Sequence, residues 1–212
     1  MDHDNRYVLI LRTCKSDMTS HNGFVWPESG PVECPNWNPE PVCGGGLHGW
    51  LWGEGNGVLG NWSKNAKWLV VRVLASDVVD LDGKVKFPRG EVVYCGPRFD
   101  ATAYLAANGG AGKAVIGIAL TGGHGSTLTG GDDSALTGGD DSTLTGGDRS
   151  TLTGGDDSTL TGGDRSTLIF EYWCHRTGRK RIAVAYPGED GIEPNVPYRC
   201  VDGKFVKAEG HS

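Results

Sequence analysis

The sequence of 212 residues contains no run of 18 apolar residues, so it offers no helix long enough to cross a membrane. Its first residues, Met-Asp-His-Asp-Asn-Arg, are polar, and no apolar signal segment follows them. These two absences predict a cytoplasmic protein. In that compartment we expect the six cysteines to be reduced thiols and not a disulfide framework.

Convincing helical patterns are also scarce. Phe99–Ala107 is the one segment that favours a helix, and it is short. Strand-length apolar runs are Tyr7–Arg12 and Trp68–Leu74, with Lys84–Phe87 and Glu91–Tyr94 expected as a hairpin or as two short edge strands. The Pro-, Gly- and Trp-rich residues 27–66 are expected to form long, ordered loops.

Glycine, by contrast, is abundant at 35 residues, and six Gly-Gly pairs in one repeat supply 12 of them. From Gly122 the chain reads GGHGSTLT, GGDDSALT, GGDDSTLT, GGDRSTLT, GGDDSTLT and GGDRSTLI. A fixed period of this kind is typical of solenoids. The preceding residues 109–116, GGAGKAVI, resemble a distorted first copy.

Alternation within Ser-Thr-Leu-Thr predicts which side chains face inward, because successive residues of a strand point to opposite faces. Leucine and serine then share the inner face, and Gly-Gly supplies the corner, either by positive φ or by close backbone approach. The inner leucines are Leu128, Leu136, Leu144, Leu152, Leu160 and Leu168. The outer threonines are Thr127, Thr129, Thr143, Thr145, Thr151, Thr153, Thr159 and Thr161.

The Asp-Asp and Asp-Arg copies alternate, which favours two copies per coil of sixteen residues. Stacking every second copy places Asp133, Arg149 and Arg165 in one column, and sets Asp140 on Asp156 and Asp141 on Asp157 in another, at roughly 4.8 Å spacing. Three coils with a core of six leucines bury little surface, so the solenoid needs end caps. We assign these caps to residues 99–120 and 169–186.

The predicted fold is therefore mainly β. It comprises an N-terminal α+β domain (1–107), a β-solenoid of about three 16-residue coils (108–169) and a small C-terminal β cap (170–212). In the cap, Phe170–Cys174 and Arg181–Tyr186 are expected to form a hairpin, and Tyr198–Val206 a further strand.

The formal charge of −6 is confined to the repeat. Residues 121–168 hold eight Asp and two Arg, and the rest of the chain holds 18 basic and 18 acidic residues. This distribution excludes direct nucleic-acid binding by the repeat. It suggests that the repeat presents a surface to a basic or nucleic-acid-binding protein, through Asp132, Asp133, Asp140, Asp141, Asp148, Asp156, Asp157 and Asp164.

The octapeptides resemble the repeats of bacterial ice nucleation proteins, whose coils carry Thr-x-Thr rows. The likeness is in the spacing and in Ser-Thr-Leu-Thr, while His124 or Asp replaces the tyrosine expected in that family's first half-coil. This resemblance implies ice binding by the threonine rows.

The whole layout also resembles an uncharacterised family of phages and prophages. The matching segments are Cys43-Gly-Gly-Gly-Leu-His48, the Gly-Asp-Arg-Ser octapeptides and Gly188–Asn195 followed by Tyr198-Arg199. The resemblance implies a phage-encoded protein in the host cytoplasm. The leading hypothesis is that the protein mimics nucleic acid or inhibits a host defence. We expect no enzymatic activity and no cofactor. An exposed end coil could also mediate dimerisation.

The first domain leaves other sites open. His48, Trp50 and Trp52 suggest a binding groove, because the two Trp share a face if the segment is extended. His48 after three glycines resembles the Gly-x-His corner of ADP-ribosyltransferase-like enzymes, although no acidic catalytic motif matches. Zinc bound by Cys34, Cys43 and His48, with Cys14 or His21, is disfavoured by the ligand spacing, so no metal is expected.

Overall fold

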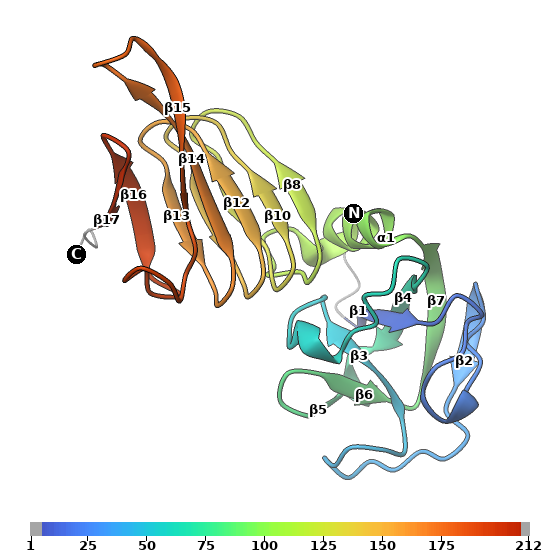
Figure 1. Ribbon diagram of the computed structural model, residues 1–212. Coiled ribbons are helices and arrows are strands. Elements are labelled where there is room, and N and C mark those ends of the chain that lie inside the picture. The colour runs from blue at the N-terminus through green and yellow to red at the C-terminus, as the bar shows by residue number, and fades with distance from the viewer. Residues whose placement is uncertain (1–5, 209–212) are drawn as a thin grey trace. The chain divides into compact units, whose positions relative to one another are not determined.

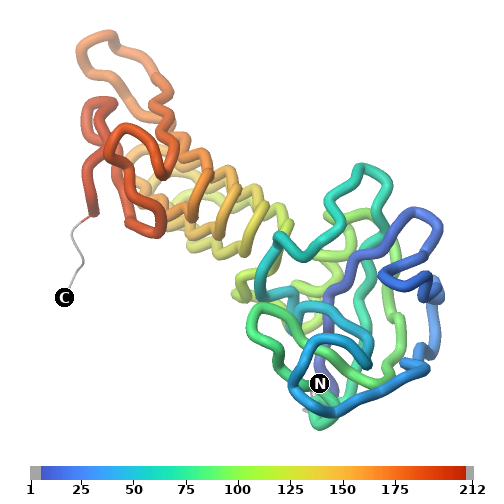
Figure 2. The backbone as a smooth tube through the Cα atoms, turned by 60° about the horizontal axis from the view of Figure 1, so that its bottom comes forward, coloured from blue at the N-terminus to red at the C-terminus, as the bar shows by residue number. Residues whose placement is uncertain are grey.

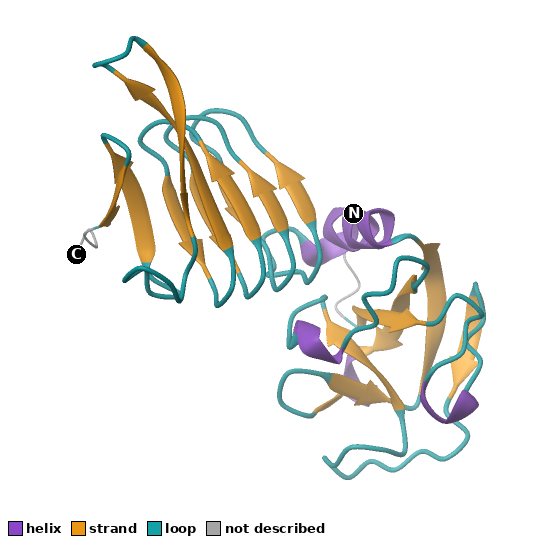
Figure 3. Ribbon diagram, in the orientation of Figure 1, coloured by secondary structure: helices purple, strands orange, loops and turns teal. Residues whose placement is uncertain are grey.

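The computed structural model describes residues 6–208. The chain divides into two compact units, Met1–Val115 and Ile116–Ser212. Strands dominate both units (Figure 3). The predicted fold class, mainly β with a short solenoid, is confirmed. Each unit is described below by itself.

The first unit is built on one seven-stranded antiparallel sheet in the order β2-β7-β4-β1-β3-β6-β5 (Figure 1). The strands are β1 (Tyr7–Cys14), β2 (Gly30–Glu33), β3 (Leu47–Leu51), β4 (Lys67–Leu74), β5 (Val79–Asp80), β6 (Val85–Phe87) and β7 (Arg89–Gly96). Short helical turns are η1 (His21–Gly23), η2 (Gly57–Leu59), η3 (Ala75–Asp77) and η4 (Ala106–Gly110). The segment predicted as long loops therefore contains two strands, β2 and β3.

The apolar run of β4 reflects burial on both faces of the sheet. Trp68, Leu69, Val70 and Val71 are all buried, because the sheet is covered on both faces at this point. Helix α1 (Arg98–Leu105), close to the predicted helix, packs against β1, β4 and β7 and buries Ala101 and Leu105. The helix thus belongs to the packing of the first unit.

The predicted pairing around Pro88 is wrong. β6 pairs with β3 and β5, whereas β7 pairs with β2 and β4. Only one residue, Pro88, connects two strands that are four places apart in the sheet order, so the sheet must curl until β6 and β7 approach each other. Proline has no N–H to donate to a hairpin ladder, and its carbonyl accepts the Cys34 N–H instead.

The second unit contains the solenoid, whose coils lie one upon another in Figures 1 and 2. One parallel sheet contains β8 (Ala119–Thr121), β10 (Ala135–Thr137), β12 (Thr151–Gly154) and β14 (Thr167–Cys174). The other contains β9 (Thr127–Thr129), β11 (Thr143–Gly146) and β13 (Thr159–Gly162). Leu136 pairs with Leu152 and Leu144 with Leu160, which confirms two octapeptides per coil.

An additional strand, β8, precedes the first glycine pair. It pairs with β10 in the register Leu120 to Leu136, so the degenerate copy is residues 114–121 and not 109–116. Ile118 then stands where the other copies have serine. Its carbonyl accepts the Ala135 N–H, as the serine carbonyls do in later coils.

The C-terminal cap closes both sheets with antiparallel strands. β15 (Arg179–Ala185) pairs with β14 in the predicted hairpin, and β16 (Pro197–Val201) pairs with β13 and with β17 (Lys204–Lys207). The single strand predicted at Tyr198–Val206 is thus a hairpin. Phe170 meets Phe205 edge to face at 5.4 Å and packs, with buried Tyr198, on the leucine core.

The inner face of the solenoid is the predicted one. Leu136, Leu144, Leu152, Leu160 and Leu168 are at most 1% exposed, and the serines beside them are at most 2% exposed. The hydroxyl of each of these five serines is hydrogen-bonded to a neighbouring coil. The Ser150 hydroxyl accepts the Ser134 N–H at 3.2 Å and donates to the Gly131 carbonyl at 3.1 Å.

We predict that Ser150→Ala destabilises the solenoid by about 1–3 kcal/mol, because it leaves a buried N–H and a buried carbonyl without this partner. The measurement is the free energy of urea unfolding, followed by far-UV circular dichroism. Thr151→Ala, at the adjacent exposed position, is the control and is expected to change stability by about 0.5 kcal/mol or less. Equal losses in the two variants would contradict the serine ladder.

Candidate functional site

The strands β9, β11 and β13 carry three complete Thr-x-Thr rows on one sheet. Their register pairs Thr127 with Thr143 and Thr159, and Thr129 with Thr145 and Thr161. The rows are roughly 4.8 Å apart and the two threonines of a row about 7 Å apart, as regular strand geometry dictates. These six threonines form a two-by-three lattice of methyl and hydroxyl groups, called the threonine array below.

The opposite sheet carries a broken version of this pattern. Thr151 and Thr153 form its one complete row, because Ala119 and Ala135 replace threonine in two rows and Ile169 replaces it in a third. Threonines at 121, 137 and 167 also lie on this sheet. Of the eight threonines predicted as one set, six therefore lie on the sheet of β9, β11 and β13, and two lie on the opposite sheet. This division follows from the 16-residue coil, which places alternate copies on opposite sheets.

The glycine pairs form corners by close approach and not by positive φ. A Cβ at Gly139 would lie 2.8 Å from the backbone nitrogen of His124 in the preceding coil. A Cβ at Gly130 would lie 2.5 Å from the Ser134 hydroxyl. The left-handed residue is instead the fourth of each copy, with φ of 56° at Asp133 and 58° at Asp141. Aspartate tolerates this conformation through local hydrogen bonding, better than most side chains.

The third residue of four of the six copies is an aspartate that links successive turns of the chain. Asp132 Oδ1 accepts the Asp148 N–H at 3.0 Å, Asp148 Oδ1 accepts the Asp164 N–H at 2.8 Å, and Asp140 Oδ1 accepts the Asp156 N–H at 3.0 Å. Asp156 continues the series into the cap, where it accepts the Trp173 N–H at 2.7 Å. These four carboxylates serve the solenoid's own backbone, a role that the sequence analysis did not predict.

The predicted column of Asp133 and Arg149 forms as a bidentate pair. Arg149 Nη2 lies 2.6 Å from Asp133 Oδ2, and its Nε lies 3.2 Å from Oδ1, so hydrogen bonding to Asp133 raises the pKa of Arg149. Arg165 does not extend the column, because its Nε donates to Asp164 at 2.8 Å. Two arginines at this corner thus offset part of the charge of its four aspartates.

At the other corner, the outermost carboxylates have basic neighbours. His124 Nε2 lies 3.5 Å from Asp141 Oδ2, and Arg199 Nη2 lies 3.5 Å from Asp157 Oδ1. Their side chains remain 57% and 74% exposed, so this corner is the part of the acidic surface open to solvent. A basic protein partner for the eight aspartates stays a prediction.

The groove expected around His48, Trp50 and Trp52 does not form as predicted. Strand β3 ends at Leu51, and Trp52 has φ of 54°, so the two Trp do not continue one extended face. Trp50 is 3% exposed and donates its indole N–H to the Asn56 carbonyl at 3.1 Å. Trp50 is therefore a core residue of the first unit.

His48 is half-buried, and no hydrogen-bond partner meets its Nε2. Burial first, and then the positive charges of Lys84, Arg12 and Lys86, lower its pKa to about 4. The folded protein therefore holds His48 as a neutral imidazole among cations at pH 7.

Within residues 6–208, no group of three or more His, Cys, Asp or Glu side chains is placed to hold a metal ion. Cys34 donates to Asn36 Oδ1, and Cys43 lies 3.2 Å from Lys84 Nζ, so the zinc ligands considered above are not assembled. All six cysteines are free. In the described part of the chain no helix is long and apolar enough to span a membrane.

The chain is similar to known proteins of two kinds. Residues 8–105, within the first unit, match a domain family described as a domain of unknown function (DUF7666). Ice nucleation proteins of Pseudomonas fluorescens and Xanthomonas campestris pv. translucens are 45% and 42% identical over 103 residues, 48% of this chain. Ice nucleation protein InaU of Pantoea ananas is 39% identical over 100 residues, 46% of the chain.

The octapeptides resemble ice nucleation repeats. The aligned regions make up only 8%, 7% and 10% of those three relatives, so the chain spans a small part of their length. No solved structure matches significantly. The phage-like layout and the nucleic-acid mimic gain no support from these matches.

We predict that Gly155→Ala destabilises the solenoid by about 1–3 kcal/mol, the usual cost of overpacking. Its Cβ would meet the Asp140 carboxylate and, at 2.8 Å, the Asp140 backbone nitrogen of the coil below. Gly123→Ala is the matched control at the same place in the repeat, where nothing lies within 4 Å. Thermal unfolding of both variants is the measurement, and a tolerated Gly155→Ala would refute corner formation by close approach.

We also predict that the first unit loses stability as the pH falls from 6.5 to 4. In this window the unfolded His48, with its ordinary pKa of 6.5, binds a proton that the folded residue rejects. The measurement is unfolding followed by tryptophan fluorescence, since six of the seven Trp lie in this unit. His48→Gln should flatten the dependence of stability on pH. His124→Gln is the control, because His124 is an exposed histidine of the other unit, and this variant should keep the wild-type dependence. Identical dependences for wild type and His48→Gln would exclude this linkage.

Proposed function

We propose that the protein binds ice through the threonine array on β9, β11 and β13. The observation that carries the proposal is the register of three consecutive Thr-x-Thr rows on one sheet. The sequence similarity of the repeat-containing region to ice nucleation proteins supports the proposal.

The array has the physical properties that an ice-adsorbing surface needs. Threonine is β-branched and stiff at χ1, so its methyl and hydroxyl groups lose little freedom on binding. None of the six array positions is charged, and the aspartates lie at the corners outside the rows. The buried serine and leucine ladders beneath hold the rows in a fixed lattice.

The small area of the array favours binding to existing ice over nucleation of new ice. Three rows span only about 10 Å across the strands, from two inter-strand spacings. A template so small stabilises little of the surface of an ice embryo. The named relatives are much longer proteins, of which this chain matches 7–10%.

The test is partitioning of the protein into slowly growing polycrystalline ice, compared with a globular protein that does not bind ice. Thr143→Tyr places a bulky ring in the middle row of the array and should reduce incorporation to the background level. Thr151→Tyr is the matched control, because it occupies the same place in the repeat on the opposite sheet and is likewise exposed. It should be incorporated like wild type.

Wild-type exclusion from ice would reject the function outright. Equal incorporation of both Tyr variants would reject the threonine array as the binding surface. Far-UV circular dichroism shows whether each variant retains its strands, so that a folding defect is not mistaken for lost ice affinity.

A further inference from the structure

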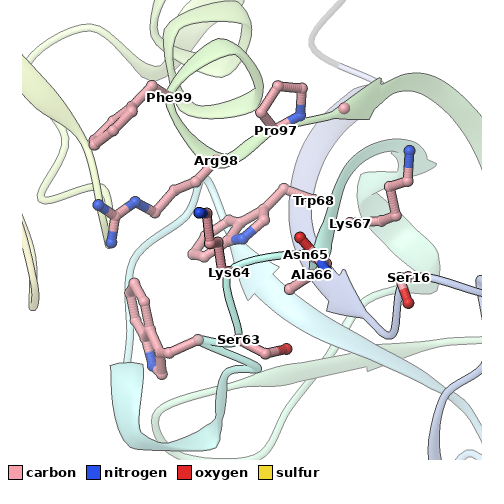
Figure 4. Close-up of a pocket in the computed structure, with 12 residues that line it drawn as sticks. Ser16, Ser63, Lys64, Asn65, Ala66, Lys67, Trp68, Pro97, Arg98 and Phe99 are labelled. Carbon is pink, nitrogen blue, oxygen red and sulfur yellow. The ribbon is translucent and has the colours of Figure 1, made fainter.

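The first unit contains a cavity of about 640 Å³ between the loop before β4 and the start of helix α1 (Figure 4). Its volume falls within the usual range for small-molecule sites, about 300–1,000 Å³. The lining includes the aromatic residues Trp62, Trp68 and Phe99 and the polar residues Ser16, Ser63 and Asn65. Neither the threonine array nor the predicted His48 groove contributes to it.

The charged side chains of the lining are all positive. They are Lys64, Lys67 and Arg98, and no Asp or Glu lines the cavity. Among the described residues, no ion pair engages any of these three cations. In Figure 4, Lys64 and Arg98 approach from neighbouring elements and Lys67 lies across from them. Three unpaired cations around one hollow attract an anion and select against a cationic or neutral ligand.

Arg98 is held by aromatic rings. Its guanidinium carbon lies 4.4 Å from the Phe99 ring centroid and 5.5 Å from that of Trp62. Such contacts fix the guanidinium plane and leave its N–H edge available, which is the geometry that binds a phosphate in bidentate fashion. Trp62 in turn meets buried Trp68 edge to face at 5.2 Å, so the aromatic wall is anchored in the core.

The start of helix α1 adds to this positive field. Pro97 is the N-cap and supplies no side-chain hydrogen bond to the first turn. The first N–H groups of a helix lack intrahelical acceptors and carry partial positive charge. This contribution is secondary to the cations and the cavity.

We propose that this cavity binds a nucleoside monophosphate, with the phosphate on Arg98 and Lys64 and the base against the exposed Phe99 ring. A planar base and an anionic phosphate together match the aromatic and cationic lining, whereas a simple anion would leave the aromatic wall unused. The cavity holds one such unit, either as a free nucleotide or as one residue of a single strand.

The experiment is isothermal titration calorimetry of the full chain with adenosine 5′-monophosphate, adenosine, inorganic phosphate and a short oligodeoxythymidine. We expect the nucleotide to bind more tightly than either adenosine or phosphate. Arg98→Gln should weaken it about tenfold or more and Lys64→Gln about threefold, in line with the loss of charge-assisted hydrogen bonds. Arg89→Gln removes a cation of the same unit that lies outside the cavity and should leave the affinity unchanged.

Absence of binding by both the nucleotide and the oligonucleotide overturns the proposal. It is also overturned if phosphate binds as tightly as the nucleotide, or if Lys64→Gln and Arg89→Gln behave alike. Lys64 is exposed, so this comparison does not depend on whether Arg98→Gln folds. Tighter binding of the oligonucleotide that is weakened in Lys64→Gln but not in Arg89→Gln assigns the nucleotide to a strand and supports the site.

Discussion

The stacking of each coil on the coil sixteen residues away is the constraint on which the solenoid depends. Leucine and serine share the inner face, but they contribute differently. The leucines exclude water, as in any core, whereas the serines bond to the backbone of the neighbouring coil, as the Ser150 hydroxyl bonds to the Ser134 N–H and the Gly131 carbonyl. The apolar contacts of the leucine core are non-directional, whereas the serine hydrogen bonds are directional and recur at the sixteen-residue register of the coils.

The outer surface inherits this fixed register. Threonines of β9, β11 and β13 form a lattice only because the coils beneath them cannot shift, and the same register on the opposite sheet displays a broken pattern. Two sheets built from one repeat thus differ as surfaces, although their cores are equivalent. The difference lies in a few outward substitutions, such as Ala135, that do not alter the fold.

The sequence predicted the solenoid well because period and alternation are local properties of the chain. Inner leucines, the 16-residue coil and the Asp133–Arg149 pair all follow from these two properties. The left-handed corner residue was missed because positive φ is ordinarily sought at glycine, and here Asp and even Arg149 adopt it. The curled sheet of the first unit was also missed, since its pairings join distant segments, and no local pattern around Pro88 shows that β6 and β7 separate.

The candidate sites divide in the same way. The threonine array could be read from the repeat once the coil length was known. The cavity beside Arg98 could not be predicted from the sequence, because its lining comes from separate segments around Ser16, Lys64 and Arg98. No motif joins these segments in the sequence, and only the fold brings them together.

The charge of the repeat has a different meaning in the structure than in the sequence. An imbalance confined to 48 residues suggests an acidic surface for a partner. Yet Asp132, Asp140, Asp148 and Asp156 each accept a backbone N–H of the next turn of chain, and a carboxylate is a strong acceptor for that purpose. Half of the eight aspartates of the repeat thus serve the solenoid's own hydrogen bonding, and the uncharged threonine array is a second regular surface that the repeat presents outward.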